Sequence, residues 1–208
     1  MVFDLKKLIR QPKQAIDPEL LEKYAAHYAE LVQTKFNFER SEENASGFDA
    51  VIRCIAHWRA FREGLCSAPE RGLFIFGDPG TGKTTALQLF SALCDVDFIS
   101  TDELSKAFSL KSGAGFWSIS DEFIHRALIV DDLGCEETSR SFGNVLPMAD
   151  FIRERERQWQ LSGIPTFFTS NARNREELSN RYGRNICSRL LGMCDFVHFS
   201  GKDYRLKR

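Results

Sequence analysis

A glycine-rich stretch with a lysine and a threonine contains the residue types and spacing that point most directly to chemistry. It reads GDPGTGKTT, in which Gly77, Gly82, Lys83 and Thr84 form the pattern Gly, four residues, Gly-Lys-Thr. Glycines let a loop curl until its backbone N–H groups converge on phosphate oxygens, and a helix that begins there directs its positive dipole end at them. Lys83 would place an ammonium on the outer phosphates, and the Thr84 hydroxyl would be a ligand of Mg²⁺. The stretch therefore predicts a site for a nucleoside triphosphate.

The surroundings of this loop favour a nucleotide site over the alternative, a glycine-rich turn without a ligand. The apolar residues 73–76 predict a short buried strand before the loop, and residues 84–93 predict an apolar-rich helix after it. A strand, this loop and then a helix is the order in which such a loop holds phosphates. The residues that we expect to contact the nucleotide are Gly77, Asp78, Pro79, Gly80, Thr81, Gly82, Lys83, Thr84 and Thr85.

Two acidic residues follow another apolar run, at residues 127–130. Asp131 is placed as the second anchor of Mg²⁺, since a carboxylate beside the outer phosphates holds the metal in position. Asp132 is then the candidate to orient and deprotonate the attacking water. The alternative is that both acids are turn or cap residues.

Two polar residues further along are candidates for the same reaction. Asn171 follows the apolar residues 166–169, and its neutral amide could bond to the γ-phosphate or to the attacking water. Asn after a strand is often only a turn residue. Arg189, in the stretch SRLL, could act in trans as an arginine finger from a neighbouring subunit. The alternative is a solvated or ion-paired arginine.

Strands that alternate with helices must position these residues. Beyond the first strand and helix, the pattern predicts strands at 96–100, 127–132, 166–169 and 196–199 and helices at 102–110, 116–126, 145–161, 176–182 and 186–191. This alternation implies an α/β fold, a mostly parallel sheet with helices on both faces. Ligands of such sheets bind at the carboxyl ends of the strands, where all of these motifs fall.

The residues before the first strand are expected to be helical. Residues 2–9 form an amphipathic segment that could dock a partner or pack on its own domain. Asp17 and Pro18 are typical of a helix start, and helices are expected at 18–35 and at 48–65 with a polar loop between them. We therefore expect a helical N-terminal extension over residues 1–47 and one further domain over residues 48–208.

Composition limits the partners and the location. The 208 residues have a formal net charge of −1, so a nucleic-acid surface would have to be local. Residues 173–208 are basic, with nine Lys and Arg against four Asp and Glu. The six cysteines are scattered without the spacing of a zinc site, which predicts reduced thiols. No signal-peptide pattern or membrane-spanning run is visible, so we expect a soluble, cytoplasmic protein with no membrane contact.

The order of motifs resembles that of the AAA+ ATPases, and more narrowly the helicase loaders of the DnaC type and the IstB-type transposition ATPases. The resemblance covers residues 48–208. The matching stretches, in chain order, are GDPGTGKTT, LIVDDLG, FGN before a long helix, TFFTSN, RYGRNICSRLL and GKDYR.

This resemblance implies a P-loop NTPase fold, an AAA+ core of five mostly parallel strands with no separate lid domain. It implies ATP with Mg²⁺, ATP-dependent assembly into a homo-oligomer, binding of single-stranded DNA, and a replicative helicase or a transposase as partner. It places Asp131 and Asp132 at the acidic pair after the third strand and Asn171 at the first sensor. Arg189 falls at the arginine of the Ser-Arg-Leu box, and Arg205 at a C-terminal arginine that approaches the nucleotide.

One departure from the family pattern affects the trans arginine. Relatives often have an arginine where this chain has Asn185, whereas Arg184 stands one position earlier. The candidates for the trans-acting residue are therefore Arg189, Arg184 and Arg181.

The DNA contact and the function class leave alternatives open. Single-stranded DNA needs basic and stacking groups together, which occur among Lys106, Phe108, Lys111, Phe116 and Trp117 and in the basic tail. The first hypothesis is an ATPase that loads a helicase or serves a transposase. The alternatives are a small-molecule kinase with the same phosphate loop and a nucleotide-gated adaptor with little hydrolysis.

Overall fold

The computed structural model describes residues 14–38, 40–110, 123, 125–136 and 147–206. The amphipathic segment at residues 2–9 and the FGN stretch lie outside the described residues, as does nearly all of the helical piece expected at 116–126. Three DNA-contact candidates, Lys111, Phe116 and Trp117, also lie outside them.

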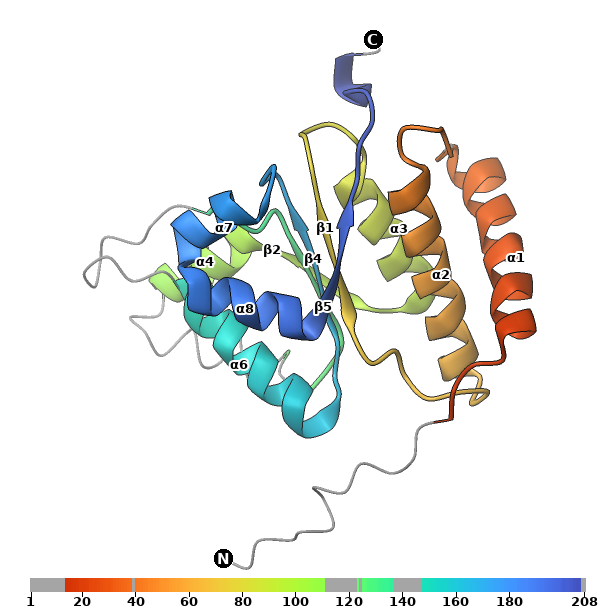
Figure 1. Ribbon diagram of the computed structural model, residues 1–208, viewed down its shortest axis with the longest axis horizontal. Coiled ribbons are helices and arrows are strands. Elements are labelled where there is room, and N and C mark those ends of the chain that lie inside the picture. Colours follow the sequence, from red (N-terminus) through yellow and green to blue (C-terminus); the bar gives the residue numbers. More distant parts are fainter. Residues whose placement is uncertain (1–13, 39, 111–122, 124, 137–146, 207–208) are drawn as a thin grey trace, which may run out of the picture.

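Five strands form one parallel sheet at the centre of the molecule (Figure 1). The strands are β1 Gly72–Phe76, β2 Asp97–Ser100, β3 Leu128–Asp131, β4 Thr166–Ser170 and β5 Cys194–His198. Their order across the sheet is β2-β3-β4-β1-β5, and every neighbouring pair is parallel. The predicted fold class, a five-stranded mostly parallel sheet between helices, is confirmed.

α2 Ala45–Arg62 and α3 Lys83–Cys94 lie on one face of this sheet, and α1 Pro18–Phe36 packs on the outer side of α2 (Figure 1). Asp17 caps α1, because its carboxylate accepts a hydrogen bond from the Glu19 N–H at 2.9 Å. Ile75 and Phe167 point from the strands into the core beneath these helices. α1 shares this core with α2 and α3 through Val32. The division at residue 47 stays a prediction.

On the other face, the described residues form the helices α4 Thr101–Leu110, α6 Pro147–Ser162, α7 Arg175–Tyr182 and α8 Arg184–Met193. Phe74 and Phe168, the sequence neighbours of Ile75 and Phe167, point into this second core. Successive side chains of a strand point to opposite faces, so unbroken apolar runs are what a sheet buried on both sides requires. None of the helices within the described ranges is long and apolar enough to cross a membrane.

Several expected boundaries differ from the structure. The second helix was expected to reach residue 65, but α2 runs from Ala45 to Arg62 and Leu65 is 41% exposed. Gly64, with φ of 75°, turns the chain away just before it. β5 begins at Cys194 rather than at residue 196, because Cys194 pairs with Gly72 although the exposed Asp195 interrupts the apolar pattern.

Candidate nucleotide-binding site

The glycine-rich loop joins β1 to α3 at the carboxyl edge of the sheet. Gly77, Gly80 and Gly82 have φ angles of 142°, 77° and 100°, which L side chains rarely adopt. A Cβ atom at Gly77 would lie 2.5 Å from the Phe199 carbonyl oxygen, and one at Gly80 would lie 1.9 Å from the Asp203 carboxylate. The spacing of these glycines is therefore required by the path of the loop, whose end begins α3.

A cavity of about 530 Å³ opens above this loop. This volume is in the range of small-molecule sites. The residues that line it come from the loop, from the ends of β3 and β4 and from the C-terminal segment: Gly80, Gly82, Lys83, Thr84, Thr85, Asp132, Asn171, Tyr204 and Arg205. Among the expected contacts, Gly77, Asp78, Pro79 and Thr81 are in the loop but not in this lining.

Lys83 is the first residue of α3 and is buried, with 4% of its surface exposed. Its Nζ donates hydrogen bonds to the Gly77 and Asp78 carbonyl oxygens at 2.9 and 2.7 Å. Burial lowers the pKa of the Lys83 ammonium, and the nearby Asp132 and Asp78 carboxylates oppose that shift. A phosphate at the cavity would replace uncharged carbonyl acceptors by charged oxygens, which bond more strongly to an ammonium.

Thr84 and Asp131 lie side by side at the floor of the site. The Thr84 Oγ1 donates to Asp131 Oδ1 at 3.0 Å, and the Thr169 Oγ1 donates to the same carboxylate oxygen at 2.6 Å. Burial raises the pKa of Asp131, and the Thr169 and Thr84 hydrogen bonds act in the opposite direction. A hydroxyl and a carboxylate are the hard oxygen ligands that Mg²⁺ prefers, and this ion usually takes one or two protein carboxylates with phosphates and waters. The residues therefore fit Mg²⁺.

Asp132 directs its carboxylate toward the cavity and toward Asn171. Its φ of 58° is left-handed, so β3 ends at Asp131 rather than at Asp132 as expected. Its backbone N–H donates to Thr169 Oγ1 at 2.8 Å, and its carbonyl accepts from Thr101 Oγ1 at 2.9 Å. The Asn171 Nδ2 donates to Asp132 Oδ1 at 3.1 Å. Two acids adjacent in sequence thus have separate surroundings.

The two threonines that hold this acidic pair were not predicted from the sequence. Thr169 forms hydrogen bonds with both Asp131 and Asp132. Thr101, the first residue of α4, donates a hydrogen bond to the Asp132 backbone carbonyl. Thr169 ends a predicted strand and precedes Ser170 and Asn171. This position at the carboxyl edge of the sheet was the signal that could have indicated a role in the site.

The C-terminal segment closes one side of the cavity. The Tyr204 N–H donates to the Gly80 carbonyl oxygen at 3.0 Å, and the Arg205 N–H donates to Asp203 Oδ1 at 2.9 Å. Arg205 lines the cavity together with Gly80 and Gly82 of the glycine-rich loop, and its contact with a nucleotide stays a prediction. Tyr204 was not predicted, although it stands next to Arg205 in the stretch GKDYR.

The three candidate trans arginines lie outside the lining of this cavity. Arg189, on α8, forms an ion pair with Glu156 of α6, and its side chain is 40% exposed. Arg181 contacts Glu136 from α7, and Arg184 is exposed at the start of α8. Arg189 in its own chain is thus an ion-paired arginine, and its role toward a neighbouring subunit stays a prediction.

A parallel sheet in this order, with a glycine-rich loop between β1 and α3, defines the P-loop NTPase fold. The DnaC helicase loader shares it with a TM-score of 0.55 and 20% identity, over 77% of this chain and 94% of that one. DnaI shares it with a TM-score of 0.52 and 18% identity, over 96% of each chain. At these identities the similarity establishes the fold alone. No protein-family model and no curated protein matches the sequence.

Proposed function

We propose that this chain is an AAA+ ATPase of the DnaC type, which binds and hydrolyses Mg²⁺-ATP and helps to load a replicative helicase onto DNA. The observation that carries the proposal is the cavity that Lys83 and Thr84 line together with the hydrogen-bonded pair Asp132 and Asn171. Asp131 bonds to Thr84 beside this cavity. The DnaC helicase loader and DnaI have the same fold, which supports the helicase as partner.

The loop binds the triphosphate through main-chain N–H groups and through Lys83. The N-terminus of α3 adds its dipole to these donors. Lys83 leaves the Gly77 and Asp78 carbonyls and moves to the outer phosphates, and Arg205 supplies a second positive charge from the C-terminal segment. Thr84 and Asp131 hold Mg²⁺, which neutralises charge on the outer phosphates when it is bound.

Asp132 and Asn171 act on the attacking water. The Asn171 amide orients the water, and the Asp132 carboxylate accepts its proton as the oxygen attacks the γ-phosphorus. The bond from this phosphorus to the bridging oxygen breaks, and ADP keeps the electron pair. A neighbouring subunit supplies Arg189 to the developing charge, so turnover by a monomer is slow.

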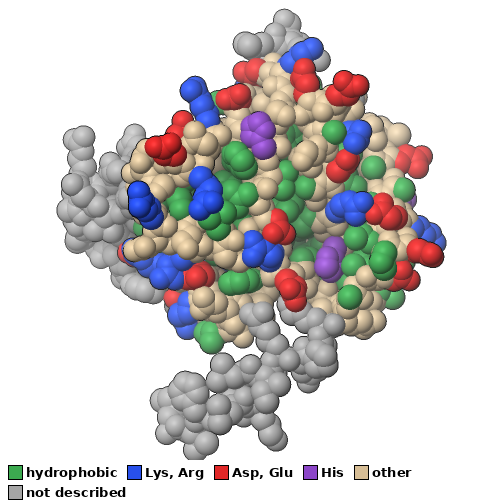
Figure 2. Space-filling view, viewed as in Figure 1, with side chains coloured by type: hydrophobic (Ala, Val, Ile, Leu, Met, Phe, Trp, Pro, Cys, Tyr) green, Lys and Arg blue, Asp and Glu red, His purple; other side chains and the backbone are tan. Residues whose placement is uncertain are grey.

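Single-stranded DNA is the proposed second ligand. The face drawn in Figure 2 has Lys and Arg side chains interspersed with Asp and Glu side chains, so its charge is mixed. The excess of basic residues in 173–208 is the feature of the sequence that supports DNA binding.

The test measures ATP turnover with and without single-stranded DNA and a purified replicative helicase, while molecular mass is followed. We expect single-stranded DNA and the helicase each to stimulate ATP turnover, and the molecular mass to rise as the chain assembles. Lys83→Ala should bind ATP about 10 to 100 times more weakly, because charge-assisted hydrogen bonds are lost. Lys23→Ala, an exposed lysine on α1, should match the wild type. Absence of ATP binding, or phosphoryl transfer to a metabolite rather than to water, would refute the proposal.

A further inference from the structure

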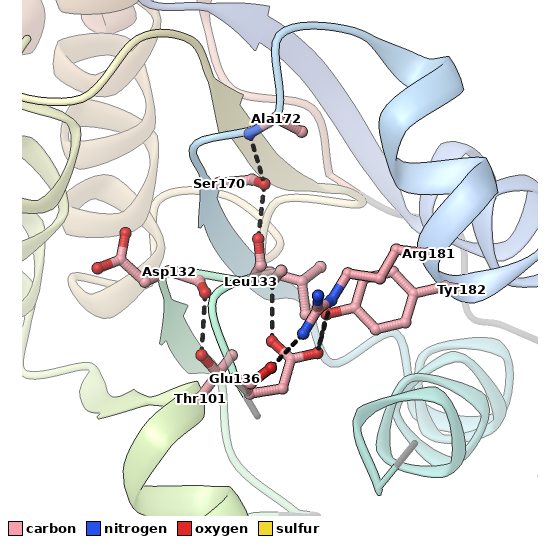
Figure 3. Close-up of polar contacts among 9 residues, drawn as sticks. Thr101, Asp132, Leu133, Glu136, Ser170, Ala172, Arg181 and Tyr182 are labelled. Atoms are coloured by element: carbon pink, nitrogen blue, oxygen red, sulfur yellow. Dashed lines mark hydrogen bonds and ion pairs between the residues drawn. The ribbon is translucent and has the colours of Figure 1, made fainter. Parts of the chain in front are cut away.

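A buried carboxylate lies just outside the cavity, in the turn that carries the two acids. Glu136 is 3% exposed, and its Oε2 accepts a hydrogen bond from the Gly134 N–H at 2.9 Å. Its Oε1 accepts from the Tyr182 hydroxyl and lies 3.4 Å from Arg181 Nε (Figure 3). Arg181 also donates to the Glu136 backbone carbonyl. The side-chain carboxylate and the backbone carbonyl of Glu136 therefore both contact residues of α7.

A buried carboxylate is costly unless it is paired, and losing one partner leaves an uncompensated charge. Arg181 supplies the opposite charge, while the Tyr182 hydroxyl and the Gly134 N–H occupy both carboxylate oxygens. Burial and the Glu136 charge raise the pKa of Tyr182, so its hydroxyl stays protonated and donates its hydrogen bond to Glu136.

The same turn is held by hydrogen bonds to β4 on its other side. The Leu133 N–H donates to the Thr169 carbonyl at 2.8 Å. The Ser170 Oγ donates to the Leu133 carbonyl at 2.6 Å (Figure 3). Residues 131–136 are thus fixed at one end by β4 and at the other by α7. Asp132 lies between these attachments, in its left-handed conformation.

α7 is in turn connected to the helix that carries Arg189. It ends at Tyr182, and Gly183, with φ of 85°, is the single residue between α7 and α8. A displacement of α8 at this glycine would act directly on Tyr182, which bonds to Glu136.

We infer that Glu136 is a positioning residue, which anchors the acidic turn to α7 and so holds the Asp132 carboxylate within hydrogen-bond distance of Asn171. Through this anchor, a movement of α7 and α8 is transmitted to the cavity. The inference rests on the proposed ATPase function. A misplacement of about 1 Å is enough to lower a rate by about 100-fold. The loss of this anchor therefore lowers turnover while the phosphate loop still binds the nucleotide.

Tyr182→Phe tests the anchor with the removal of a single hydroxyl, and Glu136→Gln tests the charge. Tyr24→Phe is the matched control, because it also removes a tyrosine–glutamate hydrogen bond, to Glu63, on the opposite side of the sheet. We expect kcat to fall about tenfold in Tyr182→Phe and at least as much in Glu136→Gln, with an unchanged Kd for a nonhydrolysable ATP analogue. The control should keep the wild-type kcat.

Cys135 provides a second readout that needs no turnover. It lies in the same turn and is exposed, with its Sγ 3.4 Å from Asn171 Nδ2. The other five cysteines are buried or, for Cys54, half-buried with a thiol pKa raised by burial. The rate at which Cys135 reacts with a disulfide reagent such as DTNB should change about fivefold in Tyr182→Phe, because a displaced turn alters the hydrogen bond that Asn171 donates to this sulfur.

The outcomes separate this inference from the proposed function. A wild-type kcat in Tyr182→Phe overturns the inference, as does a wild-type thiol rate or an equal effect in Tyr24→Phe. If wild-type protein does not hydrolyse ATP, the proposed function fails and the thiol rates alone decide whether Glu136 anchors the turn. A Cys135→Ser variant shows which thiol is being measured.

Discussion

At the scale of single residues, Asp131 and Asp132 are adjacent in sequence but have different surroundings, because the chain leaves the strand at Asp132. Asp131 ends a strand, is buried and accepts hydrogen bonds from two threonine hydroxyls. Asp132 is left-handed, lines the cavity and accepts from the Asn171 amide. A buried acid beside a hydroxyl suits a metal, whereas an acid at the cavity wall suits a proton transfer.

This division of roles predicts different defects for two isosteric variants. Asp131→Asn should weaken ATP binding only when Mg²⁺ is present, because it removes the proposed metal ligand. Asp132→Asn should bind Mg²⁺-ATP normally and lose about 100-fold to 10,000-fold in kcat, the usual contribution of a general base. The measurements are ATP affinity with and without Mg²⁺ and single-turnover hydrolysis. Identical defects in the two variants would contradict the assignment.

At the scale of elements, Arg71 joins three parts of the fold at the amino edge of the sheet. It lies just before β1 and donates to the carbonyl oxygens of Leu191, Gly192 and Cys194 at 2.7, 2.6 and 2.5 Å. Its Nε also donates to Asp195 Oδ1 at 2.6 Å. The C-terminal carbonyls of a helix lack partners within the helix, so Arg71 both caps α8 and ties it to β1 and β5.

Replacing Arg71 should therefore destabilise the fold more than the loss of a surface ion pair does. We expect Arg71→Met to lower the free energy of unfolding by about 1.5–3 kcal/mol, the range for hydrogen bonds to a charged group. Arg53→Met, which breaks an exposed pair with Glu22, should cost less than about 1 kcal/mol. Urea unfolding of both variants measures the difference. Equal losses would show that the three carbonyl contacts contribute little.

At the scale of the whole molecule, Arg189 lies outside the lining of the candidate nucleotide cavity. The cavity is at the carboxyl edge of the sheet, whereas Arg189 is on α8 and is paired with Glu156 of α6. Because Arg189 does not line the cavity of its own chain, we propose that it acts on a nucleotide bound to a neighbouring chain. Activity should therefore depend on assembly.

Turnover per chain should rise with protein concentration in the wild type and stay low in Arg189→Ala, with a loss of about 1,000-fold or more in the assembled state. Mixing Arg189→Ala with Lys83→Ala should restore part of the activity, because the second chain supplies Arg189 to the intact loop of the first. Arg153→Ala, an exposed arginine of α6, is the control. Full activity of Arg189→Ala where the wild type assembles would contradict a trans role, and Arg184 and Arg181 would be tested next.

Prediction from the sequence succeeded where a feature depends on residues close along the chain. The apolar runs predicted all five strands, and the glycine spacing predicted a loop that only glycine can form at Gly77, Gly80 and Gly82. The predicted end of the second helix at residue 65 was wrong, because the helix stops at Arg62 and Gly64, with φ of 75°, turns the chain away. Glu136 and Arg71 were missed because each is a charged residue in a polar stretch, where no local pattern distinguishes a buried anchor from a solvated side chain.

The sequence by itself determined the P-loop, the acidic pair at the end of a strand and the alternation that makes a parallel sheet, since these follow from local chain geometry and hydrophobic period. Only the tertiary structure decided that Asn171 meets Asp132, that Tyr182 and Arg181 hold Glu136, and that Arg205 returns to the loop. These contacts join residues far apart in the chain. They depend on the order in which the strands pair, which places β4 between β3 and β1.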